Sequence, residues 1–230
     1  MKSLRKAAEE EKFAAQGQFS KLGTVITLQH TTQLPPELTG ATEALHAQLS
    51  LKPISKGAPA DIHSTAEIWV AGDKCLFVLS ADEPRTNLPA PKMTSHDQDV
   101  WKEDCFELFF NPDRWFDQYY QIDVNSAGVV FDARVPNTGT SNRRTYTKPD
   151  KSFDPKFTVT HTKTDKGWQV RLMLPRAPLL PDASGVIRFN ARRFRYVTDK
   201  NNQVLQQFSW SASTGADHRP EQFGWLVLPK

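Results

Sequence analysis

Apolar and polar residues alternate along most of this chain from Gly23 onward, which is the pattern of half-buried β-strands. The first clear case is GTVITLQ at residues 23–29, and the last is FGWLVL at residues 223–228. Three pairs of such segments are joined by short turns that contain glycine, at AGDK, SAG and TDKG. The pattern predicts an all-β fold of about ten to twelve strands, an antiparallel β-sandwich of jelly-roll-like architecture.

The first twenty residues follow a different pattern. Helix formers fill residues 2–16, and Gly17 follows as a stop. We therefore expect residues 1–20 to be a short N-terminal helix or a disordered lead, and residues 21–230 to form one β-sandwich domain. Two proline-containing segments, 34–63 and 82–100, are expected to be loops.

Charge and hydropathy exclude several classes of partner. The basic start of the chain runs into Glu9, Glu10 and Glu11 instead of an apolar segment, so no secretory signal is recognised. We therefore expect either a cytoplasmic protein or one whose signal has been removed. No run approaches the roughly 18 apolar residues that a membrane-spanning helix needs, so no membrane partner is expected. The net charge of +3 comes from 29 basic and 26 acidic residues spread along the chain. The densest basic run, RFNARRFRYV, is expected to pair its arginines with carboxylates, so no nucleic-acid partner is expected. We also expect a monomer.

The segment WKEDCFELFF at residues 101–110 combines the pattern of a core strand with polar and aromatic residues outside the core face. Phe106, Leu108 and Phe110 fall on one side of an extended chain, as a core strand requires, while Glu107 falls on the other side. Trp101 would lie roughly 20 Å from Glu107 on a fully extended chain, which is too far for both to contact one small ligand. If the two residues share a site, Trp101 must lie in a curled loop.

Enzymatic chemistry is weakly supported. Asp104 and Glu107 should point to opposite faces of a strand, whereas Asp123 and Asp132 lie across a hairpin and could approach each other as a hydrolase pair. Turn and strand-edge aspartates are more often solvated, and no GxSxG motif is present, so a non-catalytic protein is expected.

Metal and disulfide chemistry is equally open. The six histidines have no HxH or HExxH spacing, and the loop SHDQD offers Asp97 and Asp99 as weak calcium ligands. The two cysteines, Cys75 and Cys105, lie in predicted strands and are either a disulfide or two buried thiols.

Sugar recognition fits the remaining aromatic and polar residues better. Sugar rings present apolar faces edged by hydroxyl groups, so their sites combine an aromatic plane with carboxylates, amides or guanidinium groups. Trp101 with Glu107 supplies both, and Trp210 with Gln207 could supply a second plane. The other tryptophans of regular strands, Trp69, Trp168 and Trp225, are expected to be core residues.

The order of seven segments resembles carbohydrate-binding module family 9 of bacterial polysaccharide-degrading enzymes. These segments are LFVLSADEP, WxxDxFELFF, YYQIDVNSAGVVFDAR, GWQVRLMLP, RFNARRFR, FSW and HRPEQFGWLVL, and they cover the chain from about residue 23 to its end. The resemblance implies a β-sandwich that binds the terminal sugars of a xylan- or glucan-type β-linked glycan between two tryptophans.

By position in these motifs, the resemblance implies particular roles for individual residues. Trp101 and Trp210 would stack on the sugar and Glu107 would grip its hydroxyl groups, with Arg134 and Gln207 as weaker candidates. Arg193 and His218 would be structural. The resemblance requires no cofactor, makes a structural calcium ion possible, and implies an extracellular or periplasmic protein of polysaccharide catabolism.

Two alternatives remain open. The domain could be an accessory part of a glycoside hydrolase without binding of its own. The architecture is also related to haem-binding, DOMON-like sandwiches, which would need an axial pair such as Met93 with His161 or His218.

Overall fold

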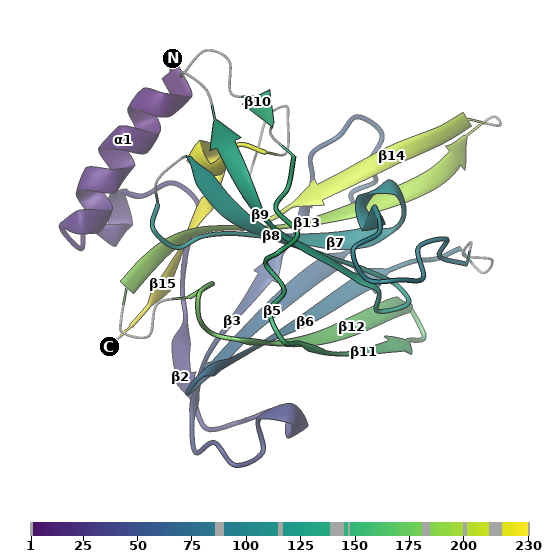
Figure 1. Cartoon of the computed structure of the whole chain (residues 1–230), viewed down its shortest axis with the longest axis horizontal. Helices are drawn as coiled ribbons and strands as arrows, with labels where there is room; N and C mark the ends of the chain where they lie inside the picture. The colour runs from purple at the N-terminus through teal and green to yellow at the C-terminus, as the bar shows by residue number, and fades with distance from the viewer. Residues whose placement is uncertain are drawn as a thin grey trace.

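The fold is a sandwich of two β-sheets with one α-helix packed on its outside (Figure 1). The computed structural model describes residues 2–85, 90–114, 117–138, 145–146, 148–180, 185–199, 202–211 and 218–229. Within these residues it has fifteen strands, nine in one sheet and six in the other. The expected all-β sandwich with a short N-terminal helix is confirmed.

The larger sheet runs in the order β1-β15-β13-β7-β8-β9-β10, and β14 and β4 continue it beside β13. Its strands are β1 (Val25–Thr27), β4 (Lys52–Pro53), β7 (Cys105–Asn111), β8 (Gln118–Asn125), β9 (Val130–Thr138), β10 (Thr145–Tyr146), β13 (Gly185–Asp199), β14 (Asn202–Ser209) and β15 (Gly224–Leu228). β1 pairs with β15 in parallel, whereas the other described pairs of this sheet are antiparallel.

The smaller sheet is antiparallel and runs in the order β11-β12-β6-β5-β3-β2. Its strands are β2 (Gln29–Thr31), β3 (Ala44–Ser50), β5 (Ser64–Ala71), β6 (Lys74–Asp82), β11 (Thr158–Lys163) and β12 (Gly167–Pro175). Short 3-10 helices occupy four connections, η1 (Phe19–Lys21), η2 (Pro36–Leu38), η3 (Val100–Lys102) and η4 (Pro220–Gln222).

The three expected hairpins are present as β5–β6, β8–β9 and β11–β12. In the first, Ala71 pairs with Lys74, which leaves a two-residue turn, and Gly72 takes a φ of +57°. Such turns require positive φ, which glycine adopts without a steric penalty.

The main core lies between the two sheets. The larger sheet contributes Phe106, Leu108 and Phe110, as their alternation predicts, and the smaller sheet contributes Phe77 and Leu79. All seven residues of β7 are buried, however, so its other face is also covered. A second apolar cluster lies there, on the face of the larger sheet that points away from the core, which we call the outer face. Its buried members are Val100, Cys105, Phe109, Tyr119, Phe131, Ala133, Val135, Phe194 and Phe223.

The expectation that residues 34–63 form a loop is wrong. They contain β3 and β4, and β3 pairs with both β2 and β5. The sequence of β3, ALHAQLS, has few β-branched or aromatic residues, so its strand propensity is weak. Pairing with two neighbouring strands decides its conformation instead.

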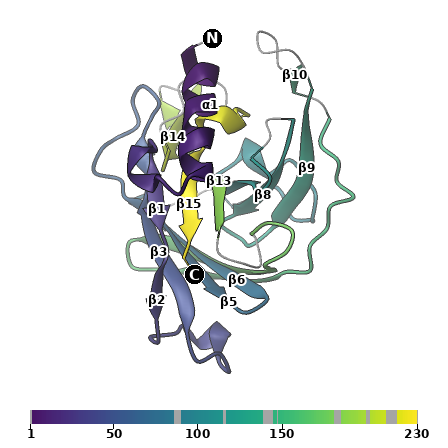
Figure 2. The same cartoon turned by 90° about the vertical axis from the view of Figure 1, so that its left-hand side faces the viewer.

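The N-terminal helix α1 (Lys2–Ala15) docks on the domain over β13 and β15 (Figure 2). Glu10 accepts a hydrogen bond from Trp225 Nε1 at 3.1 Å, and Glu11 accepts one from Arg188 Nε at 2.9 Å. The Arg188 guanidinium in turn lies 4.0 Å from the centroid of the Trp225 ring. The helix therefore covers one end of the outer face.

Buried side chains also answer two questions that the sequence left open. Cys75 and Cys105 are both free thiols, and they lie in different sheets. Trp168 and Trp225 are buried, as expected, whereas Trp69 is half-buried and stacks on His46 with the ring centroids 3.7 Å apart. None of the described helices is long and apolar enough to cross a membrane.

Candidate functional site

A row of polar side chains crosses the middle of the outer face. Arg192 on β13 pairs with Glu107 on β7, Glu107 pairs with Asp123 on β8, and Asp123 pairs with Phe131 on β9. Directly paired residues place their side chains on the same face of a sheet. A positive charge and two carboxyl groups are thus set side by side among the apolar residues of the outer-face cluster.

The carboxyl groups of this row are buried and incompletely hydrogen-bonded. The exposed fraction of Glu107 is 3%, and its Oε2 has no hydrogen-bond partner among the described residues. Asp123 is fully buried and accepts a hydrogen bond at Oδ2 from Gln121 Nε2 at 2.9 Å. Its Oδ1 and the Oε1 of Gln121 likewise have no described partner. Because unpartnered buried acceptors are unfavourable, this row is a place where hydroxyl donors from a ligand or from water would be stabilised.

Burial also controls the protonation of the row. It raises the pKa of Glu107 to about 7, against the opposing attraction of the Arg192 charge. Burial, and then the neighbouring Glu107 charge, raise the pKa of Asp123 well above its usual range. The pair therefore tends to keep at least one proton near neutral pH.

Aromatic rings surround the polar row. Trp101 lies in η3 and packs edge-on against Phe131, with the ring centroids 4.8 Å apart. Its placement in a curled turn agrees with the expectation from sequence. Two strand spacings, about 10 Å, separate Phe131 from Glu107. Trp101 and Glu107 consequently belong to the same face and the same cluster of residues.

His218 lies beside the same row. Its ring packs edge-on against Phe109, and its Nδ1 is hydrogen-bonded to the Tyr119 hydroxyl. Burial, and then the charge of Arg192, lower the pKa of His218 to about 4, so its imidazole is neutral at pH 7.

The remaining sequence-predicted site residues are divided between the two faces. Gln207 pairs with Phe194, a member of the outer-face cluster, and so lies on the same face as Glu107. Arg134 pairs with Tyr120, whose ring packs on the main core, and its Nη2 donates to Asp150 at 2.6 Å. Arg134 therefore lies on the other face.

Trp210 also lies on the core side of the larger sheet. Its ring packs on the main core at 5.9 Å from the Phe189 ring, and a methyl group built on Gly224 would lie 2.6 Å from its Cζ3. Gly224 pairs with Phe189, so both are on the core-facing side. The structure thus does not bring Trp101 and Trp210 together as facing rings.

Sequence reasoning missed Gln121 and Arg192 as parts of a site, and it considered Asp123 only together with Asp132. A signal was available, because YYQIDVN places Tyr119, Gln121 and Asp123 on one face of a strand. The hydrolase pair that Asp123 and Asp132 could have formed is not present. Asp132 pairs with Ile122, a core residue, and so points away from Asp123.

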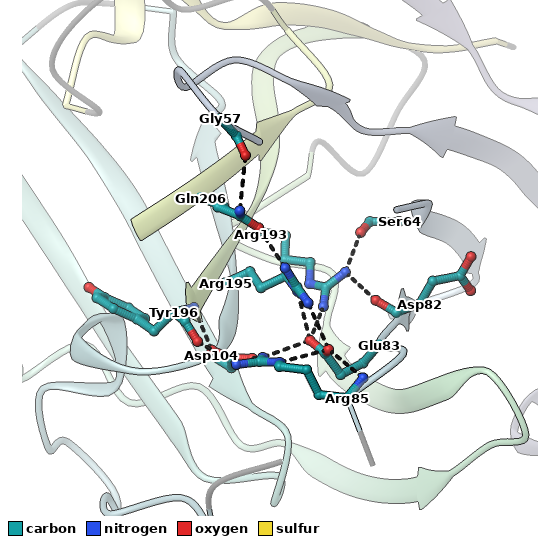
Figure 3. Close-up of polar contacts among 10 residues, drawn as sticks. All are labelled: Gly57, Ser64, Asp82, Glu83, Arg85, Asp104, Arg193, Arg195, Tyr196 and Gln206. Atoms are coloured by element: carbon teal, nitrogen blue, oxygen red, sulfur yellow. Dashed lines mark hydrogen bonds and ion pairs between the residues drawn. The ribbon is translucent and has the colours of Figure 1, made fainter. Parts of the chain in front are cut away.

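A separate polar network joins the two sheets at one end of the sandwich. Arg85, Arg193 and Arg195 converge on the carboxylate of Glu83 (Figure 3). The Nη1 of Arg193 also donates to Ser64 Oγ on β5 at 2.9 Å. Burial by itself would raise the pKa of Glu83. Hydrogen bonds from Arg85 and Arg195 stabilise the ionised carboxylate more strongly, and they lower the pKa of Glu83 to about 2. Arg193 and Arg195 of the segment RFNARRFRYV thus pair with the carboxylate of Glu83, as expected from sequence. These contacts agree with the structural role that the resemblance implies for Arg193.

A cleft of about 810 Å³ opens beside this network. Asp82, Lys163, Lys166 and Trp168 are among the residues that line it. Arg85 and Ser126 line both this cleft and a smaller one of about 290 Å³. Charges of both signs line the larger cleft, and they give it no preference for an anion or a cation.

Comparison with known families identifies the family to which this chain belongs. A family model described as carbohydrate family 9 binding domain-like matches residues 74–230, which include the outer-face row. The chain belongs to this family. The resemblance expected from the seven sequence segments is thereby supported, and membership in a family of binding domains indicates a non-catalytic domain. A search of curated proteins found no match.

Solved structures of a carbohydrate-binding protein and of family 9 modules share the fold of this chain. A candidate carbohydrate-binding protein from Bacteroides uniformis has a TM-score of 0.60 at 16% identity, covering 90% of this chain and 100% of its own. A family 9 module from Caldicellulosiruptor kristjanssonii in complex with glucose has a TM-score of 0.54 at 10% identity, covering 89% and 95%. The same kind of module in complex with cellotriose has a TM-score of 0.51 at 12% identity, covering 89% and 92%.

The weak calcium candidates do not converge in this family 9 domain. Asp99 Oδ2 accepts a hydrogen bond from Lys102 Nζ at 2.6 Å on the surface, whereas Asp97 Oδ1 lies 3.8 Å from His96 Nε2. The described residues contain one other group that could hold a metal ion, formed by His96, Asp132 and Asp154.

The residues named for a haem alternative are also divided. Met93 packs against the outer-face cluster, and His218 contacts Phe109 and Tyr119 of that cluster. His161 lies on β11 in the smaller sheet. Only the pair Met93 and His218 therefore shares a face of this family 9 domain.

Proposed function

We propose that this family 9 domain is a non-catalytic carbohydrate-binding module that recognises the terminal sugars of a β-linked glycan of the xylan or glucan type. The binding surface would be the outer face of the larger sheet. Two family 9 structures with the same fold were solved with glucose and with cellotriose. These ligands support an oligosaccharide or polysaccharide as the partner of this chain.

One observation carries the proposal, the buried acceptor row within an aromatic cluster. Three acceptor oxygens, on Glu107, Asp123 and Gln121, have no described hydrogen-bond partner. Sugar sites combine a few convergent polar groups with apolar and aromatic surroundings, because each sugar ring has apolar faces and a hydroxyl edge. The outer face has both components, whereas Trp168, the tryptophan among the described residues that line the cleft beside Glu83, is buried.

Each residue has a defined role in the proposal. Trp101 supplies the stacking plane, worth about 0.5 to 1.5 kcal/mol beyond the area it buries. Glu107 accepts hydroxyl hydrogen bonds and fixes the orientation of the sugar. Gln207 assists from β14, which is separated from the Glu107 strand by β13. Trp210 and Arg134, which lie on the other face, support the fold and do not contact the sugar. We expect micromolar or weaker affinity, about -8 kcal/mol at best.

The experiment is a calorimetric titration of the full chain with glucose, cellotriose and xylotriose. Replacing Trp101 with Ala should weaken binding of the preferred sugar by about ten-fold or more, because stacking and buried area are lost together. The matched control is Trp69→Ala, since Trp69 is also half-buried but lies on β5 of the smaller sheet. Equal sugar affinity of wild type and Trp101→Ala would refute the proposed site.

The haem alternative rests on Met93 and His218 lying over the same face. It predicts a coloured protein with a Soret band. The carbohydrate proposal predicts that the purified chain has no visible absorbance, so one spectrum separates the two functions.

The biological setting is part of the same proposal. We expect a monomer that acts outside the cytoplasm, in the extracellular medium or the periplasm. Its role would be in the catabolism of polysaccharides, as a part or a partner of a glycoside hydrolase. Cell fractionation and light scattering of the purified chain test the location and the oligomeric state.

A further inference from the structure

Three side chains from separate segments meet at the edge of the larger sheet. His96 comes from the segment before η3, Asp132 from β9, and Asp154 from the segment before β11. One donor atom from each lies within 4.8 Å of the others. His96 Nε2 and Asp132 Oδ1 are 2.6 Å apart.

A simple ion pair does not account for the whole group. The side chain of Asp132 is 1% exposed, and its Oδ2 has no hydrogen-bond partner among the described residues. The buried Oδ1 of Asp97, on the same loop as His96, has none either. A buried carboxylate oxygen without a donor is unfavourable, so a positively charged ligand would be stabilised here.

The charge of the group favours a cation as well. Asp97, Asp132 and Asp154 surround a single imidazole, so even a protonated His96 leaves an excess of two negative charges. The neighbouring Lys151 does not neutralise these carboxylates by direct bonding, because its Nζ donates to the backbone oxygen of Asp97.

The donor atoms decide the class of cation. Calcium prefers oxygen ligands alone, whereas zinc and manganese ions accept imidazole nitrogen together with carboxylates. Zinc bonds of about 2.0 to 2.2 Å in tetrahedral geometry hold neighbouring donor atoms about 3.3 Å apart. Replacing the proton between His96 and Asp132 by the metal would therefore require these side chains to separate by less than about 1 Å.

We propose that His96, Asp132 and Asp154 form a site for one divalent transition-metal ion of the zinc class, with Asp97 as a further ligand or hydrogen-bond acceptor. This site differs from the calcium site expected on Asp97 and Asp99, because it uses an imidazole and excludes Asp99. The metal would tie two surface segments to β9, beside the strand residue Phe131 on which Trp101 packs.

The test uses the full chain without a histidine tag, stripped with EDTA and desalted. Elemental analysis after zinc loading should find one ion per chain, and zinc should raise the melting temperature more than an equal concentration of calcium. Cobalt, used as a spectroscopic substitute, should give visible bands of a site with mixed nitrogen and oxygen ligands.

The variants His96→Gln and Asp154→Asn should each weaken zinc binding by about ten-fold or more, since even residues that only orient metal ligands are worth roughly 10- to 100-fold. Both residues are exposed, so their replacement should leave folding intact. His63→Gln and Asp99→Asn are the matched controls and should bind zinc as wild type does. The proposal is overturned if zinc binds wild type and the two ligand variants equally, or if calcium binds more tightly than zinc and His96→Gln leaves binding unchanged.

Discussion

Replacing Glu107 with Gln tests whether the outer-face row is truly removed from water. Burial raises the pKa of Glu107 from 4.5 to about 7, a shift of about 2.5 pH units. Each unit corresponds to about 1.36 kcal/mol, so the shift is worth roughly 3 kcal/mol of unfolding free energy. Gln has the size of a protonated Glu but cannot ionise.

The direction in which stability changes with pH follows from the protons that Glu107 binds in the folded and unfolded chain. Between pH 4.5 and about 7 the unfolded chain releases the Glu107 proton while the folded chain retains it, so wild type loses stability as the pH rises through this window. Below this window both states are protonated, and above it both are ionised. Glu107→Gln should therefore match wild type near pH 4.5 and be more stable by roughly 3 kcal/mol at pH 8.

Urea unfolding monitored by circular dichroism at several pH values measures this difference. Glu43→Gln, a change at an exposed residue, should follow the wild-type profile. Parallel stability profiles for wild type and Glu107→Gln between pH 5 and pH 8 would mean that Glu107 is solvated, and the reasoning for the buried acceptor row would fail.

Two further changes separate structural residues from binding residues. Glu83→Gln removes the negative charge that three arginines share. The free energy of unfolding at pH 7, measured by urea titration, should therefore fall by about 3 to 5 kcal/mol. A loss under about 1 kcal/mol would contradict a structural role for the network. Trp210→Ala removes a ring packed against Phe189 and Gly224. The free energy of unfolding should therefore fall by about 2 to 4 kcal/mol, while the folded protein keeps its sugar affinity. Loss of sugar binding without loss of stability would instead place Trp210 in the site.

The alternation of side chains allowed much of the fold to be predicted from sequence. The period of two in β7 identified Phe106, Leu108 and Phe110 as core residues, and glycine turns identified three hairpins. These features are local, because the direction of a side chain and the φ of a turn residue depend on immediate neighbours. Strand β3 escaped detection because its conformation depends on pairing with β2 and β5.

The candidate site was only partly predictable for the same reason. Trp101, Glu107 and Gln207 were identified and share the outer face, but the motif order could not show that Trp210 and Arg134 lie on the other face. Trp210 follows β14 directly and continues its pairing with β13, because its backbone N–H donates to the backbone oxygen of Ala191. Gln207 and Trp210 are three positions apart, so strand alternation puts their side chains on opposite faces of the sheet.

By itself, the sequence determined the all-β class, the main hairpins and the family of this protein, because these depend on alternation, turn chemistry and the order of motifs. The tertiary structure decided which polar residues meet. Glu107 and Asp123 became neighbours through strand pairing, and His96 met Asp132 and Asp154 through the approach of separate segments. Such contacts depend on register and on the packing of distant parts of the chain, which no local pattern encodes.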